Sequence, residues 1–185
     1  MVVCALARKN SARVSDCFCS SRKGWQRHAT TYLSVSLKGK KVDLAVRRRN
    51  PERWRGIEAR LGRESAIWLA TVRSDGRPHL VPLWFIWLDG RIFVATSSYS
   101  QKFVNLYHNQ NVSLALPDTE CAIIIEGEAH VAAHQAVDTL ANYFYDKYEW
   151  DFRYDDSDEF RLLEITPHKI LVWGDGYDNE GSRVL

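Results

Sequence analysis

The amino-acid sequence predicts a mainly β protein: a β-barrel of six or so short antiparallel strands with peripheral helices. Three observations point to this class. Short runs rich in Val, Ile, Phe and Trp alternate with turn residues, Asp-Gly pairs separate neighbouring runs, and two longer segments carry apolar residues at helical spacing. Many short strands with regular turn signals are typical of barrels, and amphipathic helices of this kind pack on a barrel's outside.

We place the barrel domain in residues 50–185, after a basic extension that covers residues 1–49. The extension holds 12 Lys and Arg against 2 Asp and Glu, which leaves 13 against 21 for the rest of the chain. It has no sustained apolar period, so we expect a disordered tail; its Arg- and Ser-rich composition also resembles an organellar transit peptide. The acidic balance of the domain argues against nucleic acid as a partner, because phosphate neutralisation needs a basic surface.

A helix opens the domain. Asn50 suits the cap position and Pro51 the first helical position, because a proline there gives up an amide that has no intrahelical partner. Trp54, Ile57 and Leu61 then follow at spacings of three and four residues. This spacing puts them on one face, so we expect the helix to pack on the barrel through that face.

The stretch from Ala66 to Asn105 organises the rest of the domain. Its apolar runs at 66–72, 79–87 and 92–95 are separated by turns that contain Asp75-Gly76 and Asp89-Gly90. Asp-Gly between apolar runs is a strong hairpin signal, since glycine accepts the positive φ of a tight turn. We therefore predict an antiparallel three-strand meander.

The remaining elements follow in order. We predict a fourth strand at Val112–Leu116, a long fifth strand at Ala122–Ala132, and a second helix at Ala133–Tyr148. Gly127 indicates a bulge or a close backbone approach in the fifth strand. A last strand should run from Phe160 to Ile165, pause at Thr166-Pro167, and resume from Ile170 to Trp173. The apolar stripe of the second helix consists of Val137, Leu140, Phe144 and Tyr148.

A hydroxyl-rich loop at 96–100 leads from the meander into a short helix that carries Lys102 and Asn105. Hydroxyl groups and unpaired amides at a helix start, with a cation one turn in, suit a phosphate group. Lys102 is therefore the leading candidate for a ligand-binding residue.

Two segments resemble the pyridoxamine 5'-phosphate oxidase superfamily, whose members are flavin-binding split β-barrels. They are Ala95–Leu106, which reads ATSSYSQKFVNL, and Asn111–Leu116, which reads NVSLAL. The resemblance covers roughly Pro51 to Trp173 and is strongest to small members that use FMN or the deazaflavin coenzyme F-420. It implies an FMN-binding split barrel that transfers hydride to or from an unknown small-molecule substrate. It also implies a homodimer with two cofactor sites at the interface.

The resemblance also assigns cofactor-binding positions. The family holds the flavin phosphate with a lysine at the position of Lys102 and with hydroxyls that Thr96, Ser97 and Ser100 match. Its second strand faces the pyrimidine side of the flavin, and its terminal Pro-x-x-Ile-x-x-Trp motif brings a tryptophan from the partner subunit. The corresponding residues here are Val81, Pro82, Leu83 and Trp84 on the second strand, and Trp173 at the end of Pro167–Trp173.

Several positions depart from the oxidases themselves. Leu80 and Phe85 stand where the oxidases carry Arg and Lys, and Gln101 stands beside Lys102 in place of an Arg. The segment 174–178 is acidic and Gly-rich where the oxidases end in a basic motif. Losing these cations removes charge-assisted hydrogen bonds to a substrate phosphate. We therefore expect a substrate other than pyridoxamine phosphate. The same losses, together with the Trp84-Phe85 pair, favour the deazaflavin over FMN.

Alternative functions remain open at this point: pyridoxamine 5'-phosphate oxidase proper, a non-catalytic flavin-binding module, or a haem-binding or haem-degrading split barrel with His168 as ligand. No catalytic acid or base is identified. We expect no metal site, because a strand–helix junction separates His130 from His134 and the Cys17–Cys19 pair lacks the spacer of a zinc motif. No run of ~18 apolar residues suggests a membrane span, and we expect a cytoplasmic protein.

Overall fold

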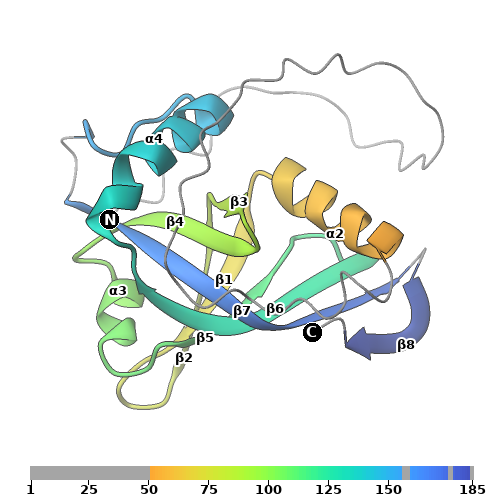
Figure 1. The fold of residues 1–185 in the computed structure, drawn as a ribbon. Helices are drawn as coiled ribbons and strands as arrows, with labels where there is room; N and C mark the ends of the chain where they lie inside the picture. The colour runs from red at the N-terminus through yellow and green to blue at the C-terminus, as the bar shows by residue number, and fades with distance from the viewer. Residues whose placement is uncertain (1–50, 156–158, 175–176, 184–185) are drawn as a thin grey trace, which may run out of the picture. The chain divides into compact units, whose positions relative to one another are not determined.

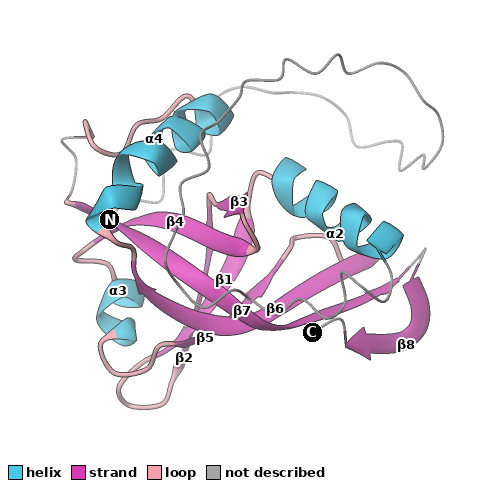
Figure 2. Cartoon of the chain, in the orientation of Figure 1, coloured by secondary structure: helices cyan, strands magenta, loops and turns pink. Residues whose placement is uncertain are grey.

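The structure is a computed structural model that describes residues 51–155, 159–174 and 177–183, with side chains through Val172. The predicted extension at 1–49 and the cap Asn50 lie outside the described residues. The described part contains three helices and eight strands (Figures 1 and 2). In chain order these are α2 Pro51–Arg63, β1 Ile67–Val72, β2 Pro78–Leu83, β3 Ile86–Leu88, β4 Arg91–Ser97, α3 Gln101–Leu106, β5 Asn111–Ala115, β6 Cys121–Val131, α4 His134–Tyr148, β7 Phe160–Gly174 and β8 Tyr177–Arg183.

The strands form one antiparallel sheet with the order β2-β1-β5-β6-β7-β4-β3, and β8 pairs with β7 outside this path. The sheet curls in the manner of a split barrel, with α2 and α4 on one side of it (Figure 1). Helix α3 lies beside the end of β1, where Asn105 donates to Thr71. This confirms the predicted mainly β fold with peripheral helices. In the described residues, no helix has the length and apolar character to cross a membrane.

The predicted three-strand meander is wrong in one respect. The run at 79–87 breaks at Trp84-Phe85 into β2 and β3, which lie at opposite ends of the sheet order. The β1–β2 and β3–β4 hairpins are therefore separate. A tertiary contact occurs at the break: the Tyr148 hydroxyl on α4 lies 3.0 Å from the Phe85 amide nitrogen and 2.7 Å from its carbonyl oxygen. A side chain thus replaces a neighbouring strand as the partner of this backbone.

The predicted pause in the last strand is also wrong, because β7 runs without interruption for 15 residues. Pro167 has no amide hydrogen to donate, and its partner strand β6 shifts register between Glu126 and Gly127 at this point. A Cβ on Gly127 would lie 2.5 Å from the Thr166 carbonyl oxygen and 3.2 Å from the Pro167 Cα. The bulge and close approach predicted at Gly127 are both confirmed.

Two apolar clusters hold the helices on the sheet. The predicted α2 face is confirmed, since Trp54, Ile57 and Leu61 are all buried in the cluster inside the curled sheet. From α4, Leu140 and Phe144 are buried in a second cluster, against which Val137 and Tyr148 pack with partial exposure. Each fully buried side chain of this size contributes roughly 1.5–3 kcal/mol of apolar transfer free energy.

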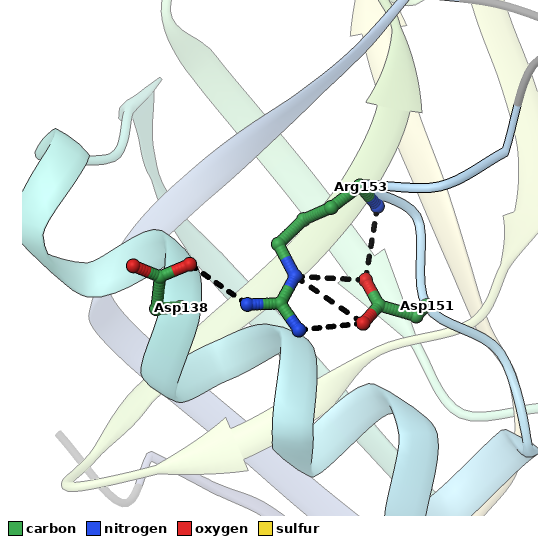
Figure 3. Close-up of polar contacts among 3 residues, drawn as sticks. All are labelled: Asp138, Asp151 and Arg153. Atoms are coloured by element: carbon green, nitrogen blue, oxygen red, sulfur yellow. Dashed lines mark hydrogen bonds and ion pairs between the residues drawn. The ribbon is translucent and has the colours of Figure 1, made fainter.

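The loop after α4 returns to the helix through an arginine (Figure 3). Glu149 ends the helix in the left-handed region with φ 55°. Arg153 then donates to Asp138 of α4 at 2.7 Å and to Asp151 at 2.6 Å. Its guanidinium holds the pKa of the Asp151 carboxyl below its usual value, mainly through their side-chain hydrogen bond. The returning loop places Trp150 and Phe152 in the second cluster.

Lys147 should make the stability of the fold depend on pH. Its amine donates to the Phe85 carbonyl at 3.1 Å and lies 4.5 Å from the Phe85 ring centroid. Burial lowers the pKa of this amine to about 8, and Glu64 offsets part of that effect. The folded protein therefore disfavours the ammonium, and its free energy of unfolding should rise as pH increases from about 8 toward the unfolded pKa.

The rise should be absent from Lys147→Met, which carries no titrating amine. Across pH 7 to 9.5 we expect wild type to gain about 1–2 kcal/mol relative to the variant, allowing for partial solvent screening. Urea unfolding of both proteins from pH 7 to 9.5 measures the difference. This range stays below the ionisation of Tyr148, whose pKa is raised by burial to about 12. Parallel pH profiles for the two proteins would show that Lys147 is not the group responsible.

Candidate functional site

The hydroxyl loop lies between β4 and α3. Ser100 caps α3 by accepting a hydrogen bond from the Phe103 amide, and its Oγ lies 3.3 Å from the Oγ1 of buried Thr96. The Ser97 Oγ accepts from the Tyr99 amide at 3.1 Å, which tightens the loop. The structure thus brings Thr96, Ser97 and Ser100 together as the sequence predicts. Lys102 follows on α3 and is half-buried.

A chain of polar contacts leads from α3 to β2. Gln101 Nε2 donates to Asn105 Oδ1 at 2.8 Å, and Asn105 Nδ2 donates to Thr71 Oγ1 at 2.8 Å. Thr71 Oγ1 in turn lies 3.4 Å from His79 Nδ1. Asn105 and Thr71 are each only 1% exposed. Because a buried amide is costly unless its hydrogen bonds are made, this chain fixes α3 on the β1–β2 hairpin.

Burial and two cations lower the pKa of His79. Burial is the largest cause that lowers the pKa of the His79 imidazole, followed by the charges of Arg73 in the β1–β2 turn and Lys102 on α3. Arg73 and Lys102 are positively charged and His79 becomes so when protonated, and Lys102 follows the hydroxyl loop. Such charges favour an anion.

Strand β2 is an edge strand, as the presence of Pro82 suggests, since a proline cannot donate to a ladder. Val81 and Leu83 pair across from Leu69 and Ile67 on the face that turns toward the core. Pro82 lies on the opposite, exposed face.

Trp84 is placed differently from the β2 residues. It follows the end of β2, and its ring stacks on Tyr148 with centroids 4.8 Å apart and an interplanar angle of 5°. The structure therefore places Val81, Pro82 and Leu83 on one strand but packs Trp84 into the second apolar cluster with α4.

The other predicted positions lie on β7. The Trp173 backbone pairs with Ala122 of β6, and its side chain is outside the described residues. His168 is exposed, and its Nε2 lies 3.9 Å from a Glu128 carboxylate oxygen. Across the described ranges, no three His, Cys, Asp or Glu side chains gather as metal ligands would.

Comparison with known proteins identifies the family. The family model described as pyridoxamine 5'-phosphate oxidase matches residues 54–174. The chain belongs to the pyridoxamine 5'-phosphate oxidase family. The matched residues begin in α2 and end at the last residue of β7, in agreement with the extent of the resemblance in the sequence. None of the curated proteins matches the chain.

Solved structures share this fold. General Stress Protein 26 from Bacillus anthracis str. Sterne is 26% identical, with a TM-score of 0.55 and coverage of 70% of this chain and 95% of that one. An F420 reductase is 21% identical, with a TM-score of 0.52 and coverage of 61% and 94%. A heme binding protein from Mycobacterium smegmatis is 18% identical, with a TM-score of 0.57 and coverage of 68% and 55%. The pyridoxamine 5'-phosphate oxidase fold thus occurs in an F420 reductase and in a heme binding protein.

Sequence reasoning missed three residues of this site: Thr71, Arg73 and His79. The sequence of the β1–β2 hairpin does contain information that could have placed Thr71 beside His79. A tight turn around Asp75-Gly76 pairs position 71 with position 79, and the structure shows this register. What the hairpin alone could not show is that α3, a part of the chain more than twenty residues later, would place Asn105 and Lys102 against the same pair. In this member of the pyridoxamine 5'-phosphate oxidase family, the polar group therefore depends on tertiary packing.

Proposed function

We propose that this protein is a flavin-type oxidoreductase that binds FMN or the deazaflavin coenzyme F-420 and exchanges hydride with a small molecule. The observation that carries the proposal is the hydroxyl loop at 96–100, which stands directly beside half-buried Lys102 in a chain of the pyridoxamine 5'-phosphate oxidase family. The fold shared with an F420 reductase adds support for the deazaflavin alternative. Hydroxyl donors and an ammonium group match the chemistry of a phosphate.

The residues of the chain would bind and orient the cofactor. Lys102 and the hydroxyls of Ser97 and Ser100 would hold its phosphate, and the β2 edge from Val81 to Leu83 would offer apolar contact and unpaired backbone groups to its ring system. A bound flavin or deazaflavin supplies the hydride chemistry itself, so the protein needs no acid or base of its own for that step.

The substrate should differ from pyridoxamine phosphate. Where the oxidases carry Arg and Lys on the second strand, this chain has Leu80, which is 59% exposed, and Phe85, which is fully buried. Neither side chain can donate to a phosphate, and the Phe85 position is enclosed by the core. Without those charge-assisted hydrogen bonds, a phosphorylated substrate gains little from this surface, so we propose a substrate that lacks a phosphate group.

Cofactor titration tests the proposed function. The purified protein should quench the fluorescence of FMN or of F-420, and the bound cofactor should raise the melting temperature of the protein with the logarithm of cofactor concentration above the dissociation constant. The bound cofactor, once reduced, should be reoxidised by an added acceptor. Tight cofactor binding without turnover would indicate a non-catalytic flavin-binding protein and not an oxidoreductase. A haem absorption band with no flavin binding would contradict the proposal.

We also propose that the protein is a homodimer, because the outer face of the β1–β2 hairpin is apolar and exposed. Trp68 is 38% exposed and pairs across the hairpin with exposed Pro82, and Leu80 pairs with Ala70 on the same face. An exposed apolar face on an edge hairpin is a liability that an interface would cover. A dimer interface here would adjoin the β2 edge that the cofactor proposal uses.

Leu80→Lys should convert the dimer to a monomer. A buried, unpaired ammonium at an interface costs several kcal/mol, which exceeds what one side chain can offset. Light scattering coupled to gel filtration measures the mass directly. Val131→Lys is a matched control, because Val131 is 58% exposed on β6. A wild-type monomer that still binds cofactor at full stoichiometry would contradict the homodimer.

A further inference from the structure

The hydrogen-bonded groups that fix α3 on the β1–β2 hairpin also orient His79. The Asn105 amide uses its carbonyl oxygen to accept from Gln101 and its nitrogen to donate to Thr71. Thr71 Oγ1 already accepts one hydrogen bond, so its own O–H is available for His79 Nδ1, 3.4 Å away. That arrangement favours the neutral imidazole with its hydrogen on Nε2.

The other ring nitrogen of His79, Nε2, differs from Nδ1 in its hydrogen bonding. Among the described residues, the structure shows no hydrogen bond at Nε2. The Thr71 hydroxyl on β1 lies 3.4 Å from the ring, and Asn105 joins that hydroxyl to α3, the helix that carries Lys102. After burial, which is the largest cause, the charges of Arg73 in the hairpin turn and of Lys102 both lower the pKa of the imidazole. The nearest acid in the turn, Asp75, is paired with Arg77 at 2.7 Å. Both charges that act on the imidazole are therefore positive.

Binding of an anion beside Lys102 should change the protonation state that the site favours for His79. Two cations disfavour a third positive charge on the imidazole, but a phosphate dianion beside Lys102 would reverse the sign of the local field. A protonated imidazole could then donate from Nε2 to a phosphate oxygen, with Thr71 accepting from Nδ1–H through its second lone pair. The hydrogen-bond chain thus accommodates both protonation states without moving α3.

We propose that His79 is a proton-linked ligand of the cofactor phosphate: it is neutral in the free protein and takes up a proton when the phosphate binds beside Lys102. The inference rests on the proposed function, because it assumes that the cofactor's phosphate occupies the site at the hydroxyl loop. It adds a specificity-determining residue that favours a phosphorylated cofactor over its dephosphorylated form, and it makes the affinity fall as pH rises.

Binding measurements from pH 6.5 to 8.5 test the inference with FMN, F-420 and riboflavin as probes. Because binding is coupled to proton uptake by His79, raising the pH should weaken FMN binding to wild type about tenfold across this range relative to His79→Gln, in which the residue cannot titrate. Riboflavin, which lacks the phosphate, should give the same profile for both proteins. His130→Gln replaces a histidine that lies beside Glu128 instead, and it should match wild type.

A measurement on the wild-type protein avoids dependence on any variant. Following the His79 imidazole by NMR should show a pKa that rises when FMN is added and stays unchanged with riboflavin. If FMN or F-420 binds but His79 titrates alike with and without it, the inference is wrong and the proposed function stands. If none of the three probes binds, the proposed function is wrong and the inference fails with it.

Discussion

Replacing Lys102 with alanine should weaken binding of FMN or F-420 by about 30- to 150-fold and leave riboflavin binding almost unchanged. Lys102 is half-buried on α3, next to the hydroxyl loop that Ser100 and Thr96 close. Loss of its ammonium would leave a partly desolvated phosphate with fewer charged donors, at a cost of about 2–3 kcal/mol. That cost corresponds to the stated change in dissociation constant. Fluorescence titration of the three ligands measures it.

Two comparisons keep this test specific. Lys169→Ala removes another partly buried lysine, which pairs with Glu126 at 3.0 Å on the β6–β7 ladder, and it should not change cofactor affinity. Unfolding of Lys102→Ala without cofactor should match wild type within about 0.5 kcal/mol, because a partly exposed lysine contributes little to stability. Equal losses for FMN and riboflavin would mean that Lys102 maintains the shape of the site and does not contact the phosphate.

Local patterns were sufficient to predict the fold class and most elements. The spacing of Trp54, Ile57 and Leu61 predicts the buried face of α2 because a helix repeats every 3.6 residues whatever it packs against. The break at Trp84-Phe85 could not be predicted in this way. The residues on both sides of the break, Leu83 and Trp84 to Trp87, are apolar and common in strands. The group that bonds to the Phe85 backbone is the Tyr148 hydroxyl of α4, which lies 63 residues later in the chain.

The residues of the candidate site likewise fall into those that local sequence patterns could predict and those that depend on tertiary contacts. The hydroxyls at 96–100 and Lys102 are contiguous, so a family resemblance and a capping pattern were enough to bring them together. The sequence could not identify His79 as a site residue, because its hydrogen bonding and its pKa depend on residues of two other elements. These are Thr71 on β1 and Asn105 and Lys102 on α3. Trp84 has a contact that its place in the sequence could not show, because its ring stacks on Tyr148 of α4. Its role at the cofactor stays a prediction.

Gly127→Ala should lower the free energy of unfolding by about 2–3 kcal/mol. Its new Cβ would lie 2.5 Å from the Thr166 carbonyl oxygen, 3.1 Å from the Thr166 carbonyl carbon and 3.2 Å from the Pro167 Cα. All three are backbone atoms of β7, which cannot rotate away as a side chain could, so the paired strands must separate or the bulge must relax. We expect the melting temperature to fall by roughly 5–15 °C, as calorimetry would measure.

Gly62→Ala provides the matched control, since it makes the same chemical change where a Cβ meets nothing within 4 Å. Gly62 lies in the last turn of α2, and alanine there should stabilise the fold by about 0.5–1 kcal/mol because it restricts the unfolded chain more than glycine does. The two variants should therefore move the melting temperature in opposite directions. If Gly127→Ala melts with wild type, the β6–β7 ladder can widen without cost, and the close approach at Thr166 is not what requires glycine at this position.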